Sequence, residues 1–263
     1  MKHRCFTLIE LLVVIAMIAF LLAILIPVLH SIRQRAKALA CSSRIRKLTL
    51  DLIMYETKNQ AFPYGFRDSY TPPPGGFPGS AAYDRRGWWW FNVMEGYGDD
   101  TKKRTLRCPS KLVRHPKLTN NLLYGNYGVN QSICKNPDDI RSHRKEFVGA
   151  PLSGSDIPHP AQTFLIVDSG YSIISWWHAT DVPPVHLDGN RGEDAAYVPG
   201  LKINKGKSLL PGQEQDAIDG RHPNKTVNVG FADGYVARKK ADGLFVEKTA
   251  DAYTNRSPLW SPE

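Results

Sequence analysis

The chain has 263 residues, of which 42% are hydrophobic and 22% charged, so the part outside any membrane anchor can bury a core. The formal net charge is +9, and six of the basic residues lie directly after an amino-terminal apolar run: Arg33, Arg35, Lys37, Arg44, Arg46 and Lys47. This distribution is typical of a juxtamembrane segment, and no nucleic-acid-binding motif accompanies it, so we expect no nucleic-acid partner. The four cysteines form no Cys-x-x-Cys pair, so the spacing typical of a structural zinc site is absent.

The apolar run extends from Phe6 to Leu29. A helix of that length is about 36 Å long, which suffices to cross a hydrocarbon core of about 30 Å. The run is also longer than the apolar region of a secretory signal, which has about 7–15 residues. Glu10 lies inside the run, where insertion of a carboxylate costs about 3 kcal/mol. Either Glu10 reaches up to the headgroups, or it has a partner and a function.

The segment FTLIELLVVIAMIAFLLAILIPVL resembles the processing and assembly segment of type IV pilin-like proteins, a family that includes the pseudopilins of type II secretion. The resemblance implies that a prepilin peptidase cleaves the Cys5–Phe6 bond and methylates the new amino terminus at Phe6. Residues 1–5 would then be a leader, and residues 6–29 a membrane and assembly helix. Cys5 stands where the family usually has glycine.

The same resemblance assigns roles in assembly. It implies that Glu10 pairs with the amino terminus of a neighbouring subunit, and that Pro27 is a kink tolerated inside the helix. It implies a single-pass protein of the inner membrane with a periplasmic carboxy-terminal domain, and the cell surface or a filament is the alternative location. The implied partners are the prepilin peptidase, other pilin-like subunits and the inner membrane. Basic residues flank the run on both sides, so they do not fix its orientation.

Residues 30–58 continue as an amphipathic pattern. Apolar residues recur mostly at three- and four-residue steps: Ile32, Ala36, Leu39, Ile45, Leu48, Leu52 and Tyr55. The spacing predicts that the same helix continues to about Lys58 with one face packed on a domain of residues 59–263. A basic helix lying on the membrane surface is the alternative.

Three adjacent tryptophans, Trp88, Trp89 and Trp90, follow a loop of residues 63–80 that is rich in proline and glycine. Three neighbouring side chains cannot all face one side of a strand or helix. They are either core residues with a covering loop, or a platform on which a glycan or a partner stacks.

The later sequence predicts strands. Residues 123–133 read as an extended segment, and residues 163–170 and 171–177 as the two strands of a hairpin. Two alternating runs flank Asp233-Gly234, which indicates a hairpin with a type I′ turn. Residues 244–249 are a candidate last strand. Together with the long helix, these segments predict an α+β, pilin-like fold whose helix packs on an antiparallel sheet with long loops.

The carboxy-terminal segment RHPNKTVNVGFADGYV resembles the His-x9-Asp-Gly segment of pseudopilin-like families from planctomycete-type bacteria, with ten residues here between His222 and Asp233. Those families also carry a Cys-Pro-Ser motif, matched by Cys108, and often a cysteine in the helix, matched by Cys41. Once the leader is removed, three cysteines remain, and the sequence alone permits three pairings. The resemblance implies the Cys41–Cys108 disulfide.

Motifs of hydrolases, metalloproteases, nucleotide-binding and dinucleotide-binding proteins are absent, so we expect no enzyme and no cofactor. One open alternative is a Ca²⁺ site among acidic and histidine side chains that the fold could bring together: Asp168, His186, Asp188, Glu193, Asp194, His222 and Asp233. For Asp233 turn chemistry, and for His222 a structural hydrogen bond, are the simpler interpretations. The sequence therefore predicts a structural subunit or accessory of a type IV pilus or type II secretion pseudopilus. A membrane-anchored surface module that binds polysaccharide or protein, and does not polymerise, is the alternative.

Overall fold

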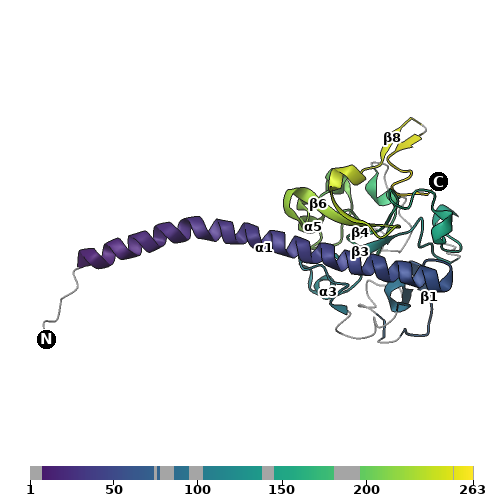
Figure 1. Ribbon diagram of the computed structural model, residues 1–263, viewed down its shortest axis with the longest axis horizontal. Coiled ribbons are helices and arrows are strands. Elements are labelled where there is room, and N and C mark those ends of the chain that lie inside the picture. The colour runs from purple at the N-terminus through teal and green to yellow at the C-terminus, as the bar shows by residue number, and fades with distance from the viewer. Residues whose placement is uncertain are drawn as a thin grey trace.

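The computed structural model describes residues 8–73, 76–77, 86–94, 103–137, 145–180, 196–250 and 252–262. One long helix, α1, spans Leu8–Asn59 and contains Pro27. It ends one residue beyond the predicted end at Lys58. Its 52 residues correspond to a length of about 78 Å. Figure 1 shows that its amino-terminal half projects away from a domain built by the rest of the chain.

The projecting half of α1 is exposed along its described length. Every residue from Leu8 to Lys37 is exposed. Within the described residues, α1 is the one helix long and apolar enough to cross a membrane. Together with the sheet described below, it confirms the predicted α+β, pilin-like architecture.

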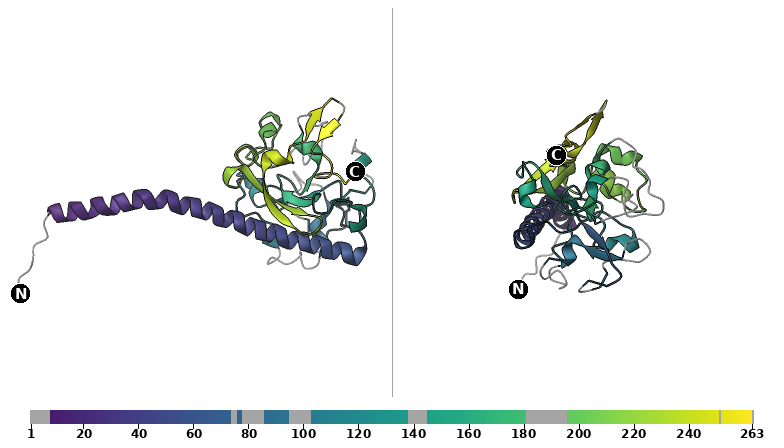
Figure 2. Two further views of the ribbon diagram at one scale, coloured as in Figure 1. Left: turned by 45° about the horizontal axis from the view of Figure 1, so that its top comes forward. Right: turned by 90° about the vertical axis from the view of Figure 1, so that its right-hand side faces the viewer.

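The carboxy-terminal half of α1 packs on the domain, as both views of Figure 2 show. Its buried apolar residues follow helical spacing: Ala38, Cys41, Ile45, Leu48 and Leu52. The predicted stripe is wrong at its start, because Ile32, Ala36 and Leu39 are exposed. The helix meets the domain only from Ala38 onward, and Leu39 lies about 100° around the helix from that residue.

A five-stranded sheet with the order β5-β3-β4-β6-β7 forms the centre of the domain. Its strands are β3 (Tyr127–Asn130), β4 (Phe164–Asp168), β5 (Ile173–Ile174), β6 (Thr226–Phe231) and β7 (Val236–Lys240). The pairs β3–β4, β4–β6 and β6–β7 are antiparallel, whereas β3–β5 is parallel. All five residues of β4 are buried, because α1 covers one face of the sheet and later segments cover the other.

The predicted hairpin of residues 163–177 is wrong. Strands β4 and β5 do not pair with each other, since β3 lies between them. The chain after β4 crosses the end of β3, where Tyr171 bridges to Tyr124. Gly128 permits this crossing, because a Cβ at that position would lie 2.5 Å from the carbonyl oxygen of Tyr171.

The predicted hairpin around Asp233-Gly234 is present as β6 and β7, but its turn is not type I′. A type I′ turn needs a positive φ at both central residues. Among the described residues of this turn only Gly234 has one, with φ 93°. The amide of Gly234 donates to Phe231 O, and that of Phe231 to Tyr235 O. The loop therefore has three residues and ends with glycine in the left-handed region.

Smaller elements surround the sheet. Strand β1 (Phe66–Asp68) pairs with β2 (Gly87–Trp89), and β8 (Glu247–Thr249) pairs with β9 (Ala252–Thr254). The predicted last strand thus exists, but it belongs to a separate two-stranded sheet. The short α-helices are α3 (Pro116–Thr119) and α5 (Glu214–Asp219). The 3₁₀ helices are Trp90–Asn92, Lys145–Phe147, Gly154–Asp156, Trp176–Ala179, Lys202–Gly206, Pro223–Lys225 and Ala241–Leu244.

A close approach fixes α1 on the sheet. A Cβ on Gly230 of β6 would lie 2.0 Å from Thr49 Oγ1 on the helix. Thr49 is buried, and its hydroxyl donates to Ile45 O. Glycine at position 230 therefore lets the backbone of β6 approach the helix.

Candidate functional site

The first candidate site is the projecting half of α1. Glu10 lies in its first turn among exposed apolar residues, including Leu8, Ile9 and Leu11. Pro27 lies inside the helix, which continues without interruption on both sides of it. The processing residues Cys5 and Phe6 lie outside the described residues. This half combines a large exposed apolar surface with the carboxylate of Glu10.

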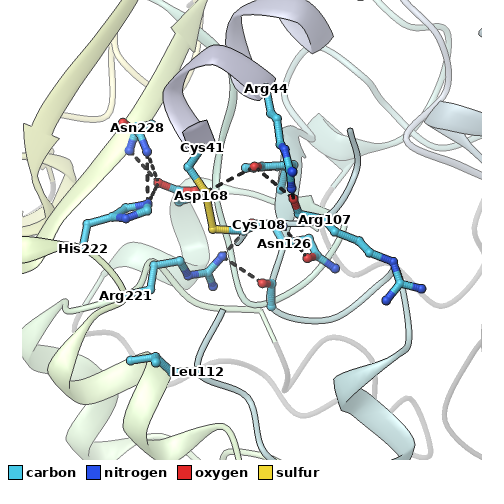
Figure 3. The surroundings of a disulfide bond; sticks show 12 residues. Cys41, Arg44, Arg107, Cys108, Leu112, Asn126, Asp168, Arg221, His222 and Asn228 are labelled. Atoms are coloured by element: carbon cyan, nitrogen blue, oxygen red, sulfur yellow. Dashed lines mark hydrogen bonds and ion pairs between the residues drawn. A yellow bond between two sulfur atoms is a disulfide. The ribbon is translucent and has the colours of Figure 1, made fainter. Parts of the chain in front are cut away.

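The second candidate site is a buried polar cluster beneath the packed half of α1 (Figure 3). The structure joins Cys41 of α1 to Cys108 in a disulfide with a Cα–Cα distance of 5.6 Å. The Tyr127 hydroxyl donates to Cys41 Sγ at 3.3 Å, and the Cys108 amide donates to Asn126 Oδ1 at 2.9 Å. Burial raises the pKa of Tyr127, and the Asp168 charge adds to that effect. The phenol therefore stays neutral and remains a donor to the sulfur.

Asp168 and His222 form the polar half of the cluster. His222 Nε2 lies 3.0 Å from Asp168 Oδ2, and both side chains have no exposed surface. The backbone N–H of Asn228 donates to the same oxygen at 2.6 Å, and the side-chain Nδ2 of Asn228 donates to it at 3.1 Å. Burial alone would raise the pKa of the Asp168 carboxyl, but His222, Arg221 and the Asn228 amide outweigh that effect and lower it. Asp168 is therefore ionised.

Arg221 ties the cluster to the surrounding loops. Its guanidinium donates to the carbonyl oxygens of Gly125, Asn126 and Ser169 at 2.7–3.0 Å. It also forms an ion pair with Asp216, and neither side chain has exposed surface. The pKa of Arg221 is raised, because Asp216 and Asp168 outweigh the effect of burial, which would lower it. The three carbonyl oxygens help to compensate for the burial of this pair, although Arg221 Nε has no hydrogen-bond partner.

The cluster brings together four side chains that are far apart in the sequence. Cys41, Cys108, Asp168 and His222 each place one ligand-type atom within 4.8 Å of the others, and all four residues are buried. Asp168 Oδ1 and His222 Nδ1 are buried without a hydrogen-bond partner. Among the described cysteines, Cys134 is a buried free thiol whose pKa is raised by burial. It is not part of this group of four.

Asp233 does not join the cluster. His222 precedes β6 and bridges to Thr226, whereas Asp233 follows the other end of the strand. Asp233 is exposed, and its Oδ1 accepts the Tyr235 amide within the turn. A ligand site shared by Asp168, His222 and Asp233 is therefore not formed. The remaining candidates for a calcium site lie outside the described residues: His186, Asp188, Glu193 and Asp194.

The three adjacent tryptophans, Trp88, Trp89 and Trp90, differ in how deeply they are buried. Trp89 and Trp90 are each only 1% exposed, and the Trp90 indole donates to Ser172 O. Trp89 and Trp90 are therefore core residues, and a stacking site could use only Trp88, which is half-buried. Trp88 lies at the wall of a cavity of about 450 Å³, which Tyr55 and Tyr64 also line.

In a comparison with known protein families, residues 1–26 match the family described as the prokaryotic N-terminal methylation motif. The chain therefore carries a pilin-type methylation motif. This motif indicates processing by a prepilin peptidase and assembly of the kind found in type IV pilins and pseudopilins. With the long apolar helix it also indicates membrane anchoring. No curated protein and no solved structure matches the chain.

Sequence reasoning missed several members of the polar cluster. It singled out Asp168 and His222, but not Asn228, which hydrogen-bonds to both, nor the neighbouring ion pair of Arg221 and Asp216. The signal for Arg221 is weak, because an arginine beside a turn is usually exposed. Only the fold shows that Arg221 is buried and surrounded by carbonyl oxygens.

Proposed function

We propose that this chain is a structural subunit, or an accessory, of a type IV pilus or a type II secretion pseudopilus. The observation that carries the proposal is the methylation motif on a helix whose residues from Leu8 to Lys37 are all exposed. Apolar surface of this extent is stable only in lipid or against other apolar helices. A membrane followed by a filament core supplies these two environments in turn.

In this proposal α1 leaves the bilayer and packs among the helices of neighbouring subunits. Glu10 then pairs with the methylated amino terminus of a neighbour, so neither charge is left alone in an apolar core. Pro27 removes one backbone hydrogen bond and introduces a local bend, which lets the exposed half adapt to its neighbours. The role is structural and needs no cofactor. The chemistry on this chain is cleavage and methylation by the peptidase.

We further propose that the chain is anchored in the inner membrane with its domain in the periplasm. The Cys41–Cys108 disulfide supports this location, since disulfides persist in oxidising compartments and are rare in the cytosol. Protease added to spheroplasts should then digest the domain. Digestion only after lysis would place the domain in the cytoplasm and contradict the proposed topology.

Intact mass of the protein from its native host tests the processing step. The expected mass lacks residues 1–5 and gains one methyl group. A full-length chain would reject the proposal of a processed subunit.

The variant E10Q tests the assembly step, because it keeps the shape of the side chain and removes its charge. We expect normal membrane insertion and cleavage, but loss of E10Q from sheared filament or pseudopilus fractions. E247Q is the matched control, since Glu247 is exposed on β8 far along the chain from the motif. Equal recovery of E10Q and wild type in those fractions would contradict the role of Glu10.

The cavity at Trp88 favours a second candidate function, a surface module that binds a glycan without polymerising. Aromatic rings of Tyr55, Tyr64 and Trp88 line it beside the charged groups of Arg67 and Asp68. Rings that stack on sugars and polar groups that orient them are typical of such sites.

A polysaccharide pulldown with the full chain in detergent tests this candidate. W88A should lose retention. Y70A should not, because Tyr70 is 98% exposed and is not among the residues that line the cavity. Equal retention of W88A and wild type would exclude the cavity as the glycan site.

A further inference from the structure

The buried cluster under α1 holds a set of side chains that suits a metal ion. Ligand-type atoms of Cys41, Cys108, Asp168 and His222 lie within 4.8 Å of one another. Two thiolates, an imidazole and a carboxylate are the ligand types that zinc takes in tetrahedral sites. We propose that, when the disulfide is reduced, these four side chains bind one Zn²⁺ ion. This inference does not depend on the proposed function in filaments.

The distances permit the site with little movement. With Zn–S bonds of about 2.3 Å, two sulfurs on a tetrahedral zinc lie about 3.8 Å apart. That separation is smaller than the 4.8 Å within which the four ligand atoms already lie. The Cα atoms of the two cysteines are 5.6 Å apart, so the thiols stay close after the sulfur–sulfur bond opens.

The surroundings hold the ligands in place. The Tyr127 hydroxyl donates to Cys41 Sγ, and both nitrogens of Asn228 donate to Asp168 Oδ2. Outer hydrogen bonds of this kind orient metal ligands and raise affinity. Two buried atoms, Asp168 Oδ1 and His222 Nδ1, have no hydrogen-bond partner. A cation in the cluster would use acceptor capacity that the protein leaves unused.

A phosphine reductant supplies two electrons to the disulfide, and water supplies the two protons of the thiols and the oxygen of the phosphine oxide. Binding of Zn²⁺ then releases the two thiol protons. The thiol form also precedes the disulfide on every newly made chain. Zinc would thus join α1 to the domain through the same residues that the disulfide joins later.

The test uses the full chain in detergent, reduced with a phosphine and then freed of metal. After addition of Zn²⁺ and desalting, elemental analysis should find one zinc per reduced chain and none per oxidised chain. Co²⁺ should give the visible bands of a tetrahedral ion together with a thiolate charge-transfer band in the near ultraviolet. Far-ultraviolet circular dichroism checks that each sample is folded.

Three variants test the ligands, and a fourth serves as a control. C41S should weaken the cobalt–thiolate band, because only the Cys108 thiolate remains as a sulfur ligand. H222Q and D168N should weaken Zn²⁺ affinity at least about 10-fold. C134S is the matched control, because Cys134 is also a buried cysteine but lies outside the cluster. It should bind as wild type does.

Three results would overturn the proposal. The first is a folded, reduced wild-type chain that retains no zinc. The second is a C134S variant that loses the metal. The third is H222Q and D168N with wild-type affinity, which would show chelation by the cysteines alone. The wild-type measurement needs no substitution, so the proposal stays testable if a variant fails to fold.

Discussion

Removal of the Cys41–Cys108 disulfide should destabilise the domain by an amount that the structure allows us to calculate. The bond closes a loop with a sequence separation of 67 residues. In the chain-entropy description, this loop lowers the entropy of the unfolded chain by about 15 cal/mol/K, which corresponds to about 4 kcal/mol at 25 °C. The free energy of unfolding of the variant C41A/C108A should therefore be about 4 kcal/mol lower than that of the wild type. The lost packing of two buried sulfur atoms lowers it further.

The matched variant C134A separates these two contributions. Cys134 is fully buried and unpaired, so its replacement removes one sulfur from the core without changing the connectivity of the chain. We expect C134A to cost about 1 kcal/mol, as is usual for a small core truncation.

Guanidinium unfolding of the full chain in detergent measures both variants. The buried indoles of Trp89, Trp90, Trp176 and Trp260 report on the core by fluorescence. A chelator must be present throughout, so that no metal substitutes for the bond. A double variant within about 1 kcal/mol of C134A would refute the reasoning, because the loop would then not constrain the unfolded chain.

Three further predictions use the same unfolding assay. G230A should lower the free energy of unfolding by about 1–3 kcal/mol, because its Cβ would meet Thr49 Oγ1 at 2.0 Å. The double variant G230A/T49A should recover part of that loss, and a loss unchanged by T49A would contradict this contact. R221M should lower the free energy of unfolding by about 3–5 kcal/mol, because it leaves Asp216 buried without its ion-pair partner. The double variant R221M/D216N should recover part of that loss, and no recovery would argue against the ion pair as the cause. Burial lowers the pKa of Lys207 from 10.5 to about 7, so the unfolded chain binds more protons between these values and wild-type stability rises with pH there. Burial also lowers the pKa of Lys111 to about 7, so Lys111 contributes to the same rise. K207M should therefore reduce the slope without abolishing it, and an unchanged slope would exclude Lys207 as a titrating group.

The long helix and the β6–β7 hairpin could be predicted because their signals are local. Three- and four-residue spacing places Ile45, Leu48 and Leu52 on one face, and that face is buried. The prediction that β4 and β5 pair was wrong, because each strand instead pairs with β3, which lies far from them in the sequence. Gly128 lets the chain at Tyr171 cross the end of β3, and no nearby residue signals this crossing.

The buried cluster shows the same limit for a site. Motif spacing detects metal ligands that are close in the sequence, such as those of a Cys-x-x-Cys motif. This sequence contains no Cys-x-x-Cys motif. Cys41, Cys108, Asp168 and His222 come from four separate segments that only the fold brings together. Asp168 and His222 could be singled out as chemically capable residues, but their proximity to the two cysteines could not be predicted from spacing.

The position of the disulfide along α1 connects the fold with the proposed function. Ala38 is the first buried residue of the helix, and Cys41 follows one turn later. Force applied to the projecting half during extraction from the membrane would act first on this turn, because the described residues before it are all exposed. Noncovalent contacts in a single turn are worth only a few kcal/mol and would open one after another. A covalent bond at Cys41 instead transmits the force to the segment at Cys108 and to the sheet beneath it. The helix and domain then move as one body.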